Sequence, residues 1–248
     1  MKKYLLFVSI LGLLSCSKDK APDCIKSAGS LVVATYTIDS FDKILVNENI
    51  ELTITQGAEY QLRIEAGEHL ISDVNYTIDN GLLTLTDNNS CNWVRRYNPT
   101  KIFVITPTLR EIRSNTQYVI KSSGTLTFAE LNLISENFNL DNISSGDFDL
   151  QIHNQNLSIV SNNLSQFYLS GSTDTLFIGF YAGTTGFFGA NLEANHINIF
   201  HRSSHDMVVH PKESLTGELR STGDLISVYA PEDVNVQELY TGKLIFLD

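Results

Sequence analysis

From about Ser114 onward, a corner of small residues recurs along the chain at intervals that are usually near 20 residues. Most corners precede a short run in which apolar and polar residues alternate, the pattern of a β-strand with one buried face. A period of this length is typical of solenoids, in which each repeat buries its inward side chains against the next. The corners are Ser122-Ser123-Gly124, Ser144-Ser145-Gly146, Ser170-Gly171, Thr184-Thr185-Gly186, Ser203-Ser204-His205, Ser221-Thr222-Gly223 and Thr241-Gly242.

The chain before the repeats also carries strand signals and no sustained helical pattern. Residues Leu31–Ile38 are rich in β-branched and aromatic side chains, and apolar residues alternate with polar ones over Glu51–Thr55 and Gln61–Glu65. Asp79-Asn80-Gly81 predicts a tight hairpin turn, because Asn and Gly accept the positive φ angles that such turns require. We therefore predict an all-β protein, a right-handed parallel β-helix-like solenoid in two lobes, residues 31–112 and 113–248. A β-sandwich with regularly spaced turns is the alternative.

The first 15 residues have the features of a secretory signal peptide. Lys2 and Lys3 precede an apolar stretch, Tyr4–Leu14, that is shorter than the roughly 20 residues needed to span a bilayer. The following Leu-Leu-Ser-Cys16 resembles the lipobox of bacterial lipoproteins, in which the cysteine becomes the acylated first residue. The alternatives are an ordinary signal peptide with a chance cysteine and a tail anchor in the membrane. Several acyl chains would hold the mature protein on a membrane, which is its expected partner.

The polar segment 16–30 is expected to act as a tether between the lipid and the first strand. Its Ser17-Lys18-Asp19 start is similar to the signals that send some Bacteroidetes lipoproteins to the cell surface, although Lys20 stands where a second acid is usual. We expect an outer-membrane lipid anchor, with the protein at the cell surface or on the periplasmic face. There Cys24 and Cys91 either form one disulfide or remain free thiols. The net charge of −11 argues against nucleic acid as a partner.

A family resemblance is carried by six blocks of the sequence, namely Phe41–Ile44, Ile50–Gly57, Gln61–Ala66, Asn80–Leu83, Cys91–Arg95 and Pro107–Ile112. These blocks resemble the putative auto-transporter adhesin head domain, also called the head GIN domain, a Bacteroidetes family without an established activity. The resemblance runs from about Thr37 to the C-terminus. It implies an exported β-helix-like protein, often in two lobes, and it assigns no catalytic or binding residue.

No arrangement of residues points firmly to catalysis or to a metal. His196, His201, His205 and His210 lie close in sequence, but their spacing matches no known metal motif. No Lys or Arg occurs from Ser122 to His201, which removes the basic residue that polysaccharide lyases use. The scattered acids Asp141, Asp147, Asp149 and Asp174 are expected to bond nearby amides in turns, although two of them could flank a glycosidic bond.

Exposed aromatic residues are the remaining candidates for a binding surface. Aromatic residues concentrate between Ser165 and Ala190, and Phe187 and Phe188 must point to opposite sides of an extended strand. We predict a non-enzymatic binding or adhesion module for an extracellular glycan or protein, without catalytic residues, metal or cofactor. A carbohydrate-active enzyme on the same scaffold and a structural envelope protein are the alternatives. The residues predicted to form the binding surface are Trp93, Arg95, Tyr181, Phe187 and Phe188.

Overall fold

The computed structural model describes residues 27–89, 98–136 and 144–247, and nearly all of its regular structure is β-strand. The prediction of an all-β protein is confirmed. In the described residues the regular structure that is not strand is one short 3-10 turn, η4 (Ile71–Asp73). The strands are β1 (Leu31–Thr37), β2 (Lys43–Val46), β3 (Ile50–Gln56), β4 (Gln61–Gly67), β5 (Val74–Asp79), β6 (Leu82–Asp87), β7 (Thr100–Thr106), β8 (Glu111–Ser114), β9 (Ile120–Leu126), β10 (Glu130–Ser135), β11 (Phe148–Ser161), β12 (Gln166–Phe180), β13 (Gly186–His201), β14 (Met207–Leu219), β15 (Leu225–Ser227), β16 (Asp233–Glu238) and β17 (Leu244–Phe246).

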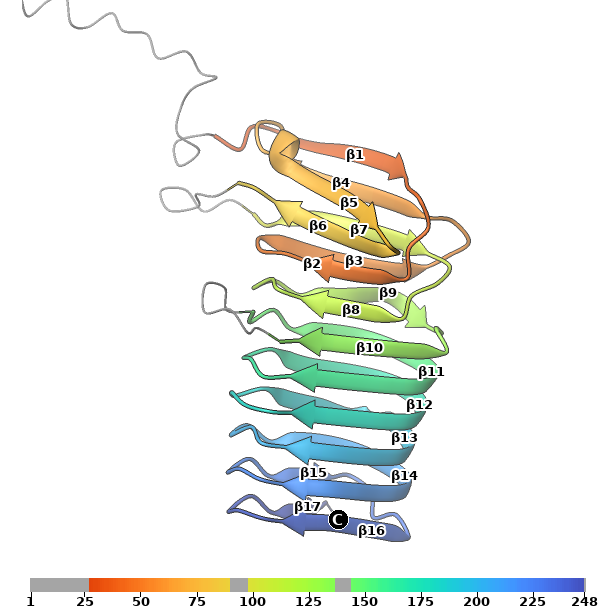
Figure 1. Ribbon diagram of the computed structural model, residues 1–248, viewed down its shortest axis with the longest axis vertical. Coiled ribbons are helices and arrows are strands. Elements are labelled where there is room, and N and C mark those ends of the chain that lie inside the picture. The colour runs from red at the N-terminus through yellow and green to blue at the C-terminus, as the bar shows by residue number, and fades with distance from the viewer. Residues whose placement is uncertain (1–26, 90–97, 137–143, 248) are drawn as a thin grey trace, which may run out of the picture.

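All of these strands join one continuous, curled sheet whose strands follow one another down the long axis of the molecule (Figure 1). Strands β11 to β14 pair in parallel with the next strand in sequence. Phe148 lies opposite Phe167, which lies opposite Phe187, and the offsets are 19 and 20 residues. The interval between the corners in the sequence is therefore the interval between paired strands.

The first part of the chain pairs differently from the rest. Strands β1 and β4, β4 and β7, and β5 and β6 are antiparallel, whereas the described strands from β8 to β17 pair with one another in parallel. The β5–β6 hairpin turns at Asn80 and Gly81, whose φ angles are 49° and 77°. The hairpin predicted from Asp79-Asn80-Gly81 is confirmed.

A single apolar core runs through the stacked strands, from Ile38 near the first strands to Leu225 near the last. Inward positions of successive strands lie in register, so like side chains pack on like. The rings of Phe148 and Phe167 stack at 4.8 Å between centroids and 8° between planes. Leu133 and Leu150 are 0% and 1% exposed, which confirms that both face the core.

Short polar side chains at the ends of the strands and in the corners hold neighbouring repeats together. The buried hydroxyls of Ser135 and Ser165 lie 2.7 Å apart, and those of Ser161 and Thr185 lie 2.8 Å apart. Buried polar groups need such partners, and the stacking of one repeat on the next supplies them. The small size of the corner residues is therefore a condition for close stacking. A Cβ on Gly242, for example, would lie 2.2 Å from the carbonyl oxygen of Gly223.

Aspartates at the starts of the strands link one repeat to the next. The Asp147 carboxylate accepts a hydrogen bond of 2.9 Å from the backbone N–H of Gln166. Asp206 accepts one of 2.9 Å from Asp224, and Asp224 accepts one of 2.8 Å from Lys243. The predicted role of corner acids as acceptors for nearby amides is confirmed for Asp147.

Candidate functional site

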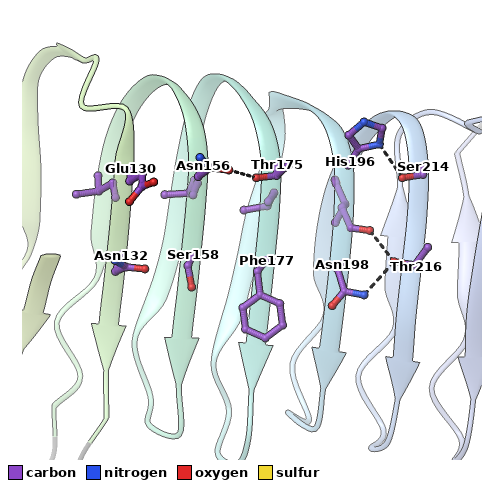
Figure 2. A pocket seen from close by; sticks show the side chains of 14 residues that line it. Glu130, Asn132, Asn156, Ser158, Thr175, Phe177, His196, Asn198, Ser214 and Thr216 are labelled. Atoms are coloured by element: carbon purple, nitrogen blue, oxygen red, sulfur yellow. Dashed lines mark hydrogen bonds between the residues drawn. The ribbon is translucent and has the colours of Figure 1, made fainter. Parts of the chain in front are cut away.

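An open groove of about 370 Å³ crosses the outer face of strands β10 to β14 (Figure 2). Its walls are outward residues because each strand alternates, with Leu131, Leu157, Leu176 and Ile197 buried between them. The register places these outward residues in two rows that run across the strands. The first row is Glu130, Asn156, Thr175, His196 and Ser214, and the second row is Asn132, Ser158, Phe177, Asn198 and Thr216.

Phe177 is the aromatic residue of the second row and lies at the middle strand of the groove. Figure 2 shows its ring extended along its own strand, toward the arrowhead, where the ring is seen face-on. Gly179 makes room for it, since a Cβ on Gly179 would lie 3.0 Å from the Phe177 ring. The neighbour on the preceding strand is Ser158, whose short side chain leaves the ring partly exposed.

The polar residues of the rows bond to one another and keep capacity for a ligand. Thr175 donates to Asn156 Oδ1 at 2.6 Å, and Asn198 Nδ2 donates to Thr216 at 2.9 Å. An amide side chain has two N–H donors and two acceptor positions, so the Asn156 amide nitrogen and the Asn198 oxygen remain able to bond outward. His196 Nδ1 lies 3.0 Å from the Ser214 hydroxyl. These contacts fix the polar side chains before any ligand arrives.

Ionisable groups are few in the groove and stand far apart. Of the residues that line it, Glu130 and His196 are ionisable. They lie on β10 and β13, three strand steps apart, which is about 14 Å at the usual strand spacing. Two groups so far apart do not act together on one bond. The groove is equipped to hold a ligand by hydrogen bonds and aromatic contact.

The structure separates the residues predicted to form the binding surface. Tyr181 is 43% exposed and contacts Phe200, with ring centroids 5.1 Å apart. Phe188 is partly exposed and stacks on Tyr168 at 4.8 Å, beside an open hollow of about 460 Å³. Neither residue lines the groove of Figure 2.

Phe187 is a correction to the predicted surface. Its side chain is 0% exposed because the register places Phe187 opposite the buried Phe167 of β12. Strand alternation then turns Phe188 outward. The prediction that one of the two rings leaves the core is confirmed, and the inclusion of Phe187 in the surface is wrong. Trp93, Arg95, Cys16, Cys24 and Cys91 lie outside the described residues.

The predicted surface includes none of the groove residues, and Phe177 is the one among them that the sequence could have indicated. The signal for it was present, because Phe177 stands between Leu176 and Ile178, both of which are buried. An aromatic residue between two inward residues of a strand must point outward.

The comparison with known families decides what kind of protein this is. Residues 40–231 match the family described as "Putative auto-transporter adhesin, head GIN domain". The chain belongs to this family. The match covers most of the chain and confirms the resemblance noted in the sequence. No curated protein matches the chain at a significant level.

Solved structures share the fold of this head GIN protein. A putative adhesin from Bacteroides fragilis is 19% identical, with a TM-score of 0.79 over 88% of this chain and 97% of that one. A putative adhesin from Parabacteroides merdae is 17% identical, with a TM-score of 0.64 over 89% and 97%. A protein from Parabacteroides distasonis titled a putative lipid binding protein is 14% identical, with a TM-score of 0.64 over 89% and 98%. At these identities the likeness is one of fold. Over the described residues, no helix has the length and apolarity needed to span a bilayer.

The four histidines that lie close in sequence, from His196 to His210, do not form one site in this head GIN protein. His201 is buried, whereas His196 and His205 are exposed on different parts of the surface, and His210 bonds through Nδ1 to the Ala190 carbonyl at 3.0 Å. Across the described ranges there is no cluster of three or more His, Cys, Asp or Glu residues that could hold a metal ion.

His201 is an ionisable group inside the core. Its ring packs edge-on against Phe180 at 6.1 Å, and neither ring nitrogen makes a hydrogen bond of good geometry within the described part of the chain, although the backbone of His205 lies close. Burial lowers the pKa of His201 from 6.5 to about 4, although the nearby Asp206 partly opposes this shift. The ring is therefore neutral in the folded protein at all but acidic pH.

Replacing His201 by Phe is expected to remove part of the acid sensitivity of folding. The unfolded chain takes up a proton near pH 6.5, but folded His201 does not do so until pH is near 4. In the wild type, His201 therefore costs no stability above about pH 6.5. The free energy of unfolding falls as the pH drops from about 6.5 to about 4, and below about pH 4 the loss due to His201 is about 3 kcal/mol. Urea unfolding at pH 7.5, 5.5 and 4 would measure how steeply the free energy of unfolding falls with pH in the wild type and in the variant. The control is His153→Gln on β11, an exposed histidine that is not among the groups acting on His201, and it should keep the wild-type dependence on pH. An unchanged dependence in His201→Phe would contradict the assignment.

Proposed function

We propose that this head GIN protein is a non-enzymatic binding module of the cell envelope that holds a glycan in the groove across β10 to β14. The observation that carries the proposal is Phe177, a partly exposed ring set in the middle of two rows of amide and hydroxyl side chains. A sugar ring has an apolar face and an edge of hydroxyls. The aromatic ring suits the first, and the amides of Asn156 and Asn198 suit the second. The groove volume of about 370 Å³ is within the range of small-ligand sites.

We propose further that the scaffold is a right-handed parallel β-helix with lobes at residues 31–112 and 113–248. The parallel pairing at offsets near 20 residues and the in-register stack of Phe148 on Phe167 support the helix. The change from partly antiparallel to wholly parallel pairing near β8 supports the division into lobes. On such a scaffold each repeat would offer the ligand the same outward positions.

The Phe177→Ala substitution tests the groove. Removing an aromatic contact at the centre of a site is expected to cost about 2 kcal/mol, which weakens binding about 30-fold. Stability should change little, because the ring is partly exposed and fills no cavity. A glycan array would identify ligands of the wild-type protein, and calorimetry would then compare the variants.

Tyr168→Ala is the matched control for that test. Tyr168 is a 43% exposed aromatic residue that does not line the groove, so its loss should leave glycan affinity unchanged. If Tyr168→Ala weakened binding and Phe177→Ala did not, the binding surface would instead be the Tyr168–Phe188 stack. That stack, with the adjacent hollow, is the second candidate surface and would suit a protein partner.

We propose that the protein reaches the envelope as a lipoprotein acylated on Cys16, and that its outer-membrane anchor displays it at the cell surface. The apolar Tyr4–Leu14 segment and the Leu-Leu-Ser-Cys16 sequence support this proposal. In that oxidising compartment, Cys24 and Cys91 are proposed to form a disulfide. Trp93 and Arg95, which follow Cys91, remain proposed as a second contact patch.

Cys16→Ala is expected to release the protein from membranes. Without the cysteine there is no acylation site, and several acyl chains account for the anchoring because each buried methylene adds about 0.8 kcal/mol. Fractionation of cells into membrane and soluble protein would measure the change. Cys24→Ala should still partition with membranes, and wild-type partitioning of Cys16→Ala would rule out the lipid anchor.

A further inference from the structure

We infer that the ligand of the groove is a linear chain of neutral sugars that lies along the stacking axis and crosses the strands. This inference rests on the proposed function and specifies its ligand. It follows from three features of the groove, namely its repetition, its length and its charge.

The groove repeats because each strand contributes the same two outward positions. Successive strands of a sheet are about 4.8 Å apart, and two outward residues of one strand are about 7 Å apart. The rows therefore form two parallel lines of polar groups with a new pair at each strand step. A ligand with a repeating unit can meet equivalent groups at each step, whereas a single compact ligand uses one or two steps.

The length of the two rows limits how many sugar units the groove can contact. The second row runs from Asn132 on β10 to Thr216 on β14, four strand steps or about 19 Å. Toward the N-terminal end the same line of positions continues with Glu111 and Lys43, which are charged. The uncharged part of the second row therefore ends at β10, and we assign the ligand to the strands from there to β14.

The charge of this face excludes acidic chains. The sequence from Ser122 to His201 contains no Lys or Arg, so β10 to β13 have no cation of their own to meet a carboxylate or sulfate. Arg113 on β8 is paired with Glu111 at 3.7 Å, Lys212 on β14 is paired with Glu193 at 3.7 Å, and Arg220, beyond β14, is paired with Glu218. The exposed carboxylate of Glu130 lines the groove and would repel an anionic sugar. Uncharged hydroxyls, by contrast, suit the amides and hydroxyls of both rows.

The test is calorimetry on the full chain with defined oligosaccharides. The neutral probes are gluco-, manno- and xylo-oligosaccharides of one to six units, and the acidic probes are oligogalacturonides of the same lengths. For at least one neutral series we expect affinity to rise at least about tenfold from one unit to four and then level off, because four units occupy the rows. Oligogalacturonides should bind at least about tenfold more weakly.

Variants at the ends of the groove separate the inference from the proposed function. Asn132→Ala and Thr216→Ala should weaken the four-unit ligand about fivefold and leave the two-unit ligand unchanged, whereas Phe177→Ala should weaken both. Affinity that does not depend on length, or preference for oligogalacturonides, would overturn the linear neutral ligand while Phe177→Ala still supports glycan binding. Failure of all neutral probes to bind, or binding that Phe177→Ala does not change, would overturn the proposed function and this inference together.

Discussion

Leu150→Asp is expected to unfold the stacked strands at ambient temperature. Leu150 lies on β11, is 1% exposed and belongs to the continuous apolar core. The substitution removes the packing of a buried leucine, which alone costs about 2 to 5 kcal/mol. It also places a carboxylate where the described core offers no charged partner, so we expect a total loss of more than about 4 kcal/mol. A domain of ordinary stability does not withstand a loss of that size.

The measurement is urea unfolding followed by circular dichroism, with two controls on the same strand. Gln151→Asp introduces the same carboxylate at the adjacent, exposed position and should change stability by less than about 0.5 kcal/mol. Leu150→Met keeps the volume and should cost less than about 1.5 kcal/mol. A folded Leu150→Asp variant with a wild-type midpoint would mean that Leu150 does not face the core.

The inward and outward assignment of residues was predictable because strand alternation needs no knowledge of distant parts of the chain. Leu133 and Leu150 follow from it, and so does the rule that Phe187 and Phe188 point to opposite sides. Which of the two phenylalanines is buried was not predictable, because both are apolar and either parity fills the core. The register with β12, where Phe167 pairs with Phe187, decides it.

The lengths of the strands were not predictable from apolar runs. β11 to β14 each contain 13 to 16 residues, although the alternating runs seen in the sequence are only about four residues long. β11 includes the polar segment His153–Asn156, which pairs in register with β12 except at Gln155. Backbone hydrogen bonds to neighbouring strands do not depend on side-chain polarity, so a strand continues through residues that look like a loop.

The groove itself depends on contacts that sequence alone does not specify. Ser158 leaves Phe177 uncovered only because the two residues are opposite each other, 19 positions apart. Strand offsets in this chain vary, since Met207 pairs with Leu225 after 18 residues and Phe187 with Met207 after 20. A shift of one residue would move every outward side chain to the core, so no groove can be assigned before the register is known.

Gly171→Ala is expected to have the second large effect, for a reason that lies in the backbone. Gly171 has a φ of 110°, and a Cβ there would lie 1.9 Å from the carbonyl oxygen of Ile152, its partner on β11. The overlap is with backbone rather than with a movable side chain, so β11 and β12 must separate at this corner. With the unfavourable φ added, we expect a loss of more than about 3 kcal/mol.

Gly124→Ala separates the two contributions to that loss. Gly124 also has a positive φ, 87°, but no atom lies within 4 Å of the position where a Cβ would be. This variant should lose only the cost of a left-handed alanine, about 1 to 2 kcal/mol. Urea midpoints of both variants would measure the difference, which reports the closeness of β11 and β12 at the corner. Equal losses would mean that the strands are not stacked that closely at Gly171, and that the glycine is required only for its φ angle.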